Sequence, residues 1–112
     1  MKGNALKISS AAIALIKKQH GLSLEKYRDE QGVWVIGYGH VIRQWENSRG
    51  LITPIQAEYL LHDDLQLCET LLMENITRSL TQRQHDALVM MIFSFGMIPS
   101  LATEMLQAVE RV

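Results

Sequence analysis

A helix start near the middle of the sequence decides more about the fold than any other segment. Thr53-Pro54-Ile55-Gln56 places a threonine at the N-cap and a glutamine three residues later, which is the arrangement of a capping box. Pro54 falls at the first helical position, where its missing N–H costs nothing. An apolar stripe at helical spacing follows, formed by Leu61, Leu65, Cys68 and Leu72. The sequence therefore predicts a long amphipathic helix that runs to about Asn75.

The segment before this helix changes character at Gly21. Residues 8–19 carry apolar side chains at helical spacing behind a possible cap at Ser9 or Ser10, which predicts a short first helix. Residues 22–40 are instead rich in β-branched and aromatic residues and are punctuated by glycines. They predict a small antiparallel hairpin region, followed by a polar loop over residues 43–50.

Two more helices are expected after the long one. Thr81-Gln82-Arg83-Gln84 repeats the capping-box pattern, and residues 87–95 behind it are apolar on nearly every side. A helix of that kind is expected in the middle of a bundle. A last helix is expected over residues 100–111. The predicted class is α+β, in one domain over residues 1–112, with a helix and hairpin region at 8–50 and a helical lobe at 53–112.

Composition excludes several classes of protein. The 112 residues include 11 Lys and Arg against 12 Asp and Glu, and the basic residues are scattered, so nucleic-acid binding is not expected. The only cysteine, Cys68, cannot form an internal disulfide. The apolar run at residues 11–16 is too short for a signal peptide, and residues 87–95 are too few to cross a bilayer. We therefore expect a cytoplasmic protein with no signal peptide and no membrane insertion.

Residues 20–40, HGLSLEKYRDEQGVWVIGYGH, carry a more specific pattern. They resemble the active-site hairpin of the phage-type lysozymes, the endolysins of glycoside hydrolase family 24. The positions in register are Gly21, Leu22, Leu24, Tyr27, Asp29, Gly32, Trp34, Ile36, Gly37, Gly39 and His40. Later segments resemble the family's interdomain and central helices, namely Ile52-Thr53, Gln56-Ala57-Glu58, Leu60-Leu61, Asp64-Leu65, Leu80-Thr81-Gln82, Gln84, Asp86-Ala87-Leu88 and Phe93-Ser94-Phe95-Gly96. The resemblance implies a lysozyme-like fold in a bacteriophage protein that acts within its host bacterium.

The resemblance also shows where this chain departs from the family. The family's general acid is a glutamate before the first glycine of the hairpin, and His20 stands there. Asp29 matches the family's aspartate, whereas Val35 replaces the threonine whose hydroxyl holds the hydrolytic water. Glycoside hydrolysis normally uses two carboxyl groups, and only one of them is kept. The departures therefore imply a pseudoenzyme.

Two alternatives for these residues stay open. His20 could donate a proton as an imidazolium, because a nearby Asp29 carboxylate would raise its pKa. Against this, a cation beside an oxocarbenium-like transition state is unhelpful, and Val35 cannot hold the water. Asp29 could equally be a turn residue of the hairpin.

The resemblance implies a structural ion pair between His40 and Asp64, while no cofactor is expected. A metal could be suggested by His62, Asp63 and Asp64 together with His20 and Asp29, but their spacing does not suit one, so no metal site is predicted. The chain ends at Val112, where the family domain continues into further helices, so we expect a C-terminally truncated lobe. A second copy or another protein could complete it.

These observations predict a phage- or prophage-derived lysozyme-like protein that has lost muramidase catalysis and works by binding. The expected partner is a protein, in phage regulation or counter-defence, or the glycan of the cell wall. The alternative is an active or weakly active endolysin that hydrolyses the β-1,4 bonds of peptidoglycan. A degenerate remnant without a selected role is the third hypothesis.

Overall fold

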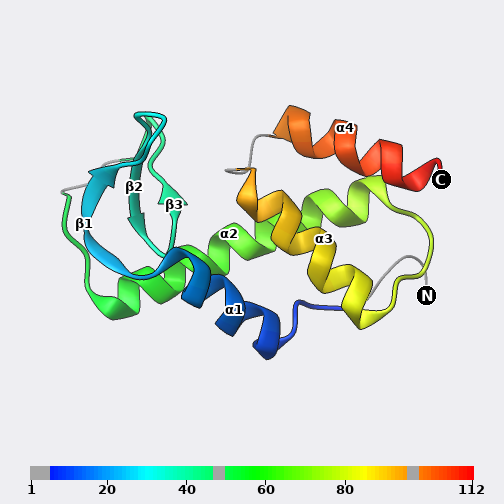
Figure 1. Cartoon of the computed structure of the whole chain (residues 1–112), viewed down its shortest axis with the longest axis horizontal. Helices are drawn as coiled ribbons and strands as arrows, with labels where there is room; N and C mark the ends of the chain where they lie inside the picture. Colours follow the sequence, from blue (N-terminus) through cyan, green and yellow to red (C-terminus); the bar gives the residue numbers. More distant parts are fainter. Residues whose placement is uncertain (1–5, 47–49, 96–98) are drawn as a thin grey trace. The chain divides into compact units, whose positions relative to one another are not determined.

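The part of the chain that the structure describes folds into four helices and one small sheet (Figure 1). This computed structural model describes residues 6–46, 50–95 and 99–112. The elements are α1 (Ser10–His20), β1 (Ser23–Arg28), β2 (Trp34–Gly37), β3 (His40–Val41), α2 (Pro54–Asn75), α3 (Gln82–Ser94) and α4 (Pro99–Glu110). The predicted α+β class is confirmed, with the element order that the sequence indicated.

The elements group into two compact units. The first unit comprises residues 14–63 and contains the sheet, and the second comprises the described residues up to 13 together with those from 64 onward. Helices α1 and α2 each supply residues to both units, whereas the sequence suggested a division into residues 8–50 and 53–112.

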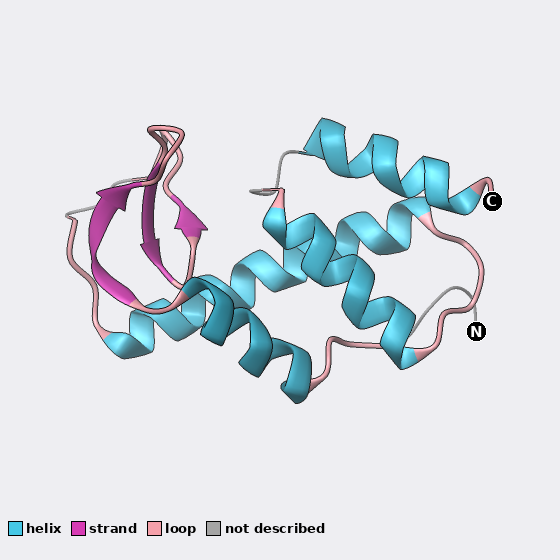
Figure 2. Ribbon diagram, in the orientation of Figure 1, coloured by secondary structure: helices cyan, strands magenta, loops and turns pink. Residues whose placement is uncertain are grey.

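The sheet of the first unit is antiparallel, in the order β1-β2-β3 (Figure 2). Tyr27 lies opposite Val35 in the first ladder, and Val35 lies opposite Val41 in the second. The other edge of β1 is also hydrogen-bonded, because Lys26 N–H donates to Gly50 O at 2.9 Å. The apolar core of this unit contains Ile16, Val35, Ile36, Ala57 and Leu61.

Helix α2 begins as the capping box requires. The Gln56 N–H donates to Thr53 Oγ1 at 3.1 Å, and the Thr53 N–H donates to Gln56 Oε1 at 2.8 Å. All four members of the predicted apolar stripe are buried, each with 3% or less of its surface exposed. Among them Cys68 is fully buried, and that burial raises the pKa of its thiol to about 12. The thiol is therefore not poised for thiolate chemistry at neutral pH.

Helix α3 also begins at a capping box, with Thr81 and Gln84 in the predicted roles. Its burial differs from the prediction, however. Only one face is buried, formed by His85, Leu88, Val89, Ile92 and Phe93. Ala87 and Met91 are exposed, so the expectation of a helix surrounded by a bundle was wrong. Gly96, the last residue of the family-like motif here, lies outside the described residues.

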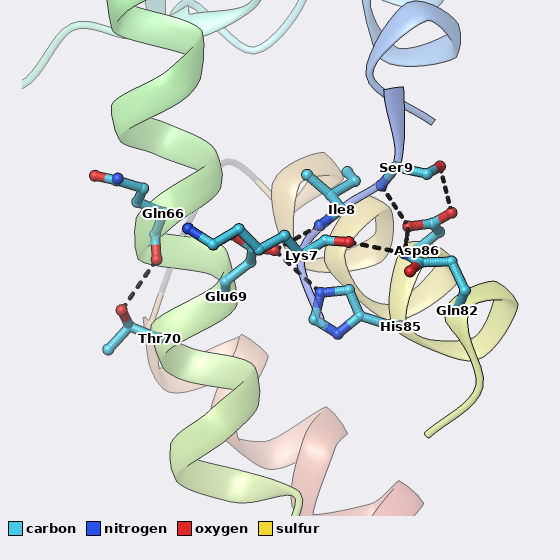
Figure 3. Close-up of polar contacts among 9 residues, drawn as sticks. All are labelled: Lys7, Ile8, Ser9, Gln66, Glu69, Thr70, Gln82, His85 and Asp86. Atoms are coloured by element: carbon cyan, nitrogen blue, oxygen red, sulfur yellow. Dashed lines mark hydrogen bonds and ion pairs between the residues drawn. The ribbon is translucent and has the colours of Figure 1, made fainter. Parts of the chain in front are cut away.

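A polar cluster ties the segment before α1 to helices α2 and α3 in the second unit (Figure 3). The Ile8 N–H donates to Glu69 Oε2 at 2.7 Å, and the same oxygen lies 3.0 Å from Nε2 of the buried His85. Ser9 donates to Asp86 twice, from its N–H at 2.9 Å and from its hydroxyl at 2.6 Å. Partial burial raises the pKa of Asp86, but these hydrogen bonds outweigh it and the net pKa is lowered. The cluster thus fixes where α1 begins, with Ser9 Oγ accepting the Ala12 N–H.

Candidate functional site

His20 is the last residue of α1, and it lies against the backbone of the glycine-rich segment after β2. A Cβ placed on Gly39 would lie 2.6 Å from His20 Nδ1, and Gly39 has a φ of +81°. Only glycine therefore meets both the steric and the backbone requirement at this position. Helix α1 ends beside it, where Gly21 takes a φ of +70° and its N–H donates to Lys17 O at 2.8 Å.

Partial burial affects the acid–base character of His20. Partial burial lowers the pKa of the imidazole from its ordinary value, because the charged form loses hydration. The sequence left open the opposite direction, in which a nearby Asp29 carboxylate raises the pKa of His20. A lowered pKa leaves the ring mostly neutral at pH 7, and a neutral imidazole is a very weak proton donor.

Asp29 forms the turn between β1 and β2. Its Oδ1 accepts the N–H groups of Gln31 at 2.8 Å and of Val33 at 2.9 Å. The backbone closes the same turn, since the Asp29 N–H donates to Val33 O at 2.9 Å. Asp29 is exposed, and within the described residues its other oxygen, Oδ2, forms no hydrogen bond. One carboxylate oxygen thus holds the hairpin, and the second is open to a ligand.

Val35 sits in the middle strand, with 5% of its surface exposed. Its neighbours across the two ladders are Tyr27 and Val41. The side chain has the shape of a threonine but no hydroxyl, so it cannot donate to or accept from a water molecule. At this position the chain has a packing residue where the family resemblance places a water-binding one.

His40 is buried, with 6% of its surface exposed, and its Nε2 lies 2.8 Å from Glu46 Oε2. The other oxygen of Glu46 accepts the Arg43 N–H at 2.9 Å. Partial burial raises the pKa of Glu46, but the hydrogen bonds from His40 and Arg43 outweigh it and lower the pKa overall. Glu46 was not predicted from the sequence, because the spacing of residues in a polar loop does not show which of them turns back to His40.

The predicted partner of His40 was Asp64. Asp64 is buried in α2, with 4% of its surface exposed, and it is the first residue of the second unit. The pair between His40 and Asp64 stays a prediction.

Neither a metal centre nor a membrane span is found in the described part of the chain. No group of three or more histidine, cysteine or acidic side chains there could hold a metal ion. None of the described helices combines the length and the apolar character that crossing a bilayer requires.

Comparison with known proteins places this hairpin in a family. Residues 17–111 match the family model described as phage lysozyme. The endolysin of Acyrthosiphon pisum secondary endosymbiont phage 1 is 39% identical over 90 residues, which are 80% of this chain and 60% of that protein. The endolysin of Salmonella phage P22 is 36% identical over 94 residues, covering 81% of this chain and 64% of that one.

The chain belongs to the phage lysozyme family. A solved structure agrees with this assignment. The crystal structure of a putative phage endolysin from S. enterica is 49% identical, with a TM-score of 0.72, and the match covers 80% of this chain and 95% of that one. The predicted lysozyme-like fold is therefore confirmed. This phage lysozyme homologue nevertheless spans only about 60% of the length of the first endolysin it matches.

Proposed function

We propose that this chain binds the peptidoglycan of the bacterial cell wall without hydrolysing it. The observation that carries the proposal is the state of His20. The family resemblance assigns this position to the general acid, yet an imidazole stands there and its partial burial lowers its pKa. The lowered pKa disfavours the imidazolium, the form of His20 that would have to protonate the departing sugar oxygen.

The two other family positions support the same proposal. Asp29 uses one carboxylate oxygen to hold its own turn, and Val35 has no group that could position a water molecule. Loss of a positioned general acid typically costs about 10²–10⁴ in rate. A nucleophile that is not held in place forfeits a further part of the acceleration.

The relatives support a cell-wall ligand. Those described above are named endolysins, and an endolysin acts on the cell wall. We therefore favour a cell-wall polymer over a protein partner as the ligand of this chain.

An active endolysin is the second candidate, and two observations favour it. The relatives' names fit an active enzyme as well as an inactive one, and Oδ2 of Asp29 is open to a ligand. In this case Asp29 would be the working carboxylate, and the proton would come from another donor.

Two assays on one preparation separate the candidates. The purified chain is mixed with bacterial sacculi, and both its sedimentation and the turbidity of the suspension are followed. Binding without hydrolysis predicts that the chain sediments while the turbidity stays constant. Clearing that disappears in Asp29→Ala would establish the active enzyme instead, and a chain that stays in the supernatant would refute wall binding.

A further inference from the structure

Two cationic side chains of β1 gather on one tryptophan of β2. The Nζ atom of Lys26 and the Cζ atom of Arg28 each lie 4.8 Å from the centre of the Trp34 ring. Arg28 is directly opposite Trp34 in the ladder between the strands. The two positive charges can thus be no farther apart than twice that distance, which makes them a single local feature.

Contacts within the chain hold this cluster in place. The stem of Lys26 lies over Gly50, since a Cβ there would be 3.4–3.5 Å from three of the lysine's carbons. Its ammonium group lies over Trp34, so the side chain is held at both ends. The Arg28 guanidinium lies over the same ring, and its N–H groups can still donate to a ligand. Side chains that are already ordered lose less conformational entropy on binding.

Within the described residues, the two cations of the cluster form no ion pair with a carboxylate. Neither Lys26 nor Arg28 forms an ion pair with another described residue. Residues 1–5, 47–49 and 96–98, which lie outside the described ranges, include no Asp or Glu. Lys17, by contrast, is paired with Glu58 at 2.6 Å. Lys26, Arg28 and Trp34 are all exposed, so both charges are available to an anion from outside.

The cluster and Val35 lie on opposite faces of the hairpin. Trp34 and Val35 are consecutive in β2, and consecutive side chains in a strand point to opposite faces of the sheet. Val35 is buried, while Trp34 has 38% of its surface exposed. The cluster therefore occupies the face of the hairpin opposite Val35.

We propose that Lys26, Arg28 and Trp34 bind the carboxylate groups of the peptide stems of peptidoglycan, an inference that rests on the proposed wall binding. Recognition of an anionic lipid surface typically takes clusters of about 4–8 basic residues, so two are too few. A chain with a net charge of −1 is also poorly suited to nucleic acid. A wall polymer repeats its carboxylates, which multiplies a weak contact through effective concentration. Arginine in addition matches the geometry of a carboxylate.

The test is co-sedimentation with intact sacculi at low salt. The variant Lys26→Gln/Arg28→Gln is expected to bind about tenfold more weakly, which corresponds to ~1.4 kcal/mol. The matched control is Lys18→Gln/Arg83→Gln, which removes the same charge from two exposed positions. It is expected to bind within about twofold of the unaltered chain. An equal loss in both variants, or no loss in either, would overturn the proposal.

A second arm uses sacculi whose carboxyl groups have been converted to neutral amides with carbodiimide and ethanolamine. On this material the unaltered chain should fall to the affinity of Lys26→Gln/Arg28→Gln, and the variant should lose nothing further. A difference in affinity between the unaltered chain and the variant that persists on the neutral wall would overturn the proposal. It would also be overturned if the variant lost binding to anionic lipid vesicles as strongly as it loses binding to sacculi. If the unaltered chain binds no sacculi at all, wall binding itself fails. If the unaltered chain and the variant bind sacculi equally well, only the proposed role of this cluster fails.

Discussion

The contact between His20 and Gly39 allows a stability prediction with an internal control. Gly39→Ala adds a methyl group at a φ of +81°, 2.6 Å from His20 Nδ1. The left-handed backbone alone costs a non-glycine residue about 1–2 kcal/mol. The clash adds about 1 kcal/mol, at the low end for overpacking because the ring can rotate away. We expect the free energy of unfolding, measured by urea denaturation, to fall by about 2–3 kcal/mol.

Gly32→Ala provides the matched control. Gly32 has the same φ of +81°, but nothing lies within 4 Å of a Cβ placed there. Gly32→Ala should lower the free energy of unfolding by the backbone cost alone, about 1–2 kcal/mol. The extra loss at Gly39 should vanish in a His20→Ala background, because the ring that causes it is gone. Equal losses at the two glycines, or an excess that survives removal of the ring, would refute this account of how His20 is packed.

Two further predictions concern the second unit. Asp86→Asn should lower the free energy of unfolding by about 1 kcal/mol at pH 7, because it weakens the hydrogen bonds from Ser9. The pKa of Asp86 is lower in the folded chain than its ordinary value of 3.8. The ionised carboxylate therefore stabilises the fold fully above pH 3.8, and this stabilisation is lost as the pH falls through the pKa of the folded state. Urea denaturation should therefore show a smaller difference at pH 3 than at pH 7, and a constant difference would contradict the assignment. Leu72→Ala, at a position 1% exposed, should cost about 2–5 kcal/mol in thermal unfolding, whereas Leu67→Ala, at a position 52% exposed, should stay within about 0.5 kcal/mol.

Helix starts could be predicted from the sequence because their signals are local. Thr53 and Thr81 each bond to a glutamine three residues later, and both capping boxes form as expected. The extent of burial around α3 could not be predicted, since an apolar run does not reveal how many neighbours will cover it. Ala87 and Met91 belong to this apolar run, yet both are exposed, because only the opposite face of α3 is buried.

The candidate site also depends on contacts between residues that are distant in the sequence, and these could not be predicted. The family pattern identified His20, Asp29 and Val35 as the positions of interest. His20 lies against Gly39, which is distant in sequence, and the partial burial that lowers the pKa of the ring could not be predicted from spacing alone. Likewise His40 bonds to Glu46 through a loop whose path no spacing rule predicts.

Release of reducing ends from purified peptidoglycan tests the central proposal most directly. The account predicts no release by the unaltered chain at pH 7. The variant His20→Glu/Val35→Thr, which supplies a carboxyl group and a hydroxyl at the two altered positions, should gain measurable release. Release by the unaltered chain at the rate of an ordinary endolysin would contradict the account, because His20 would then be no obstacle to catalysis.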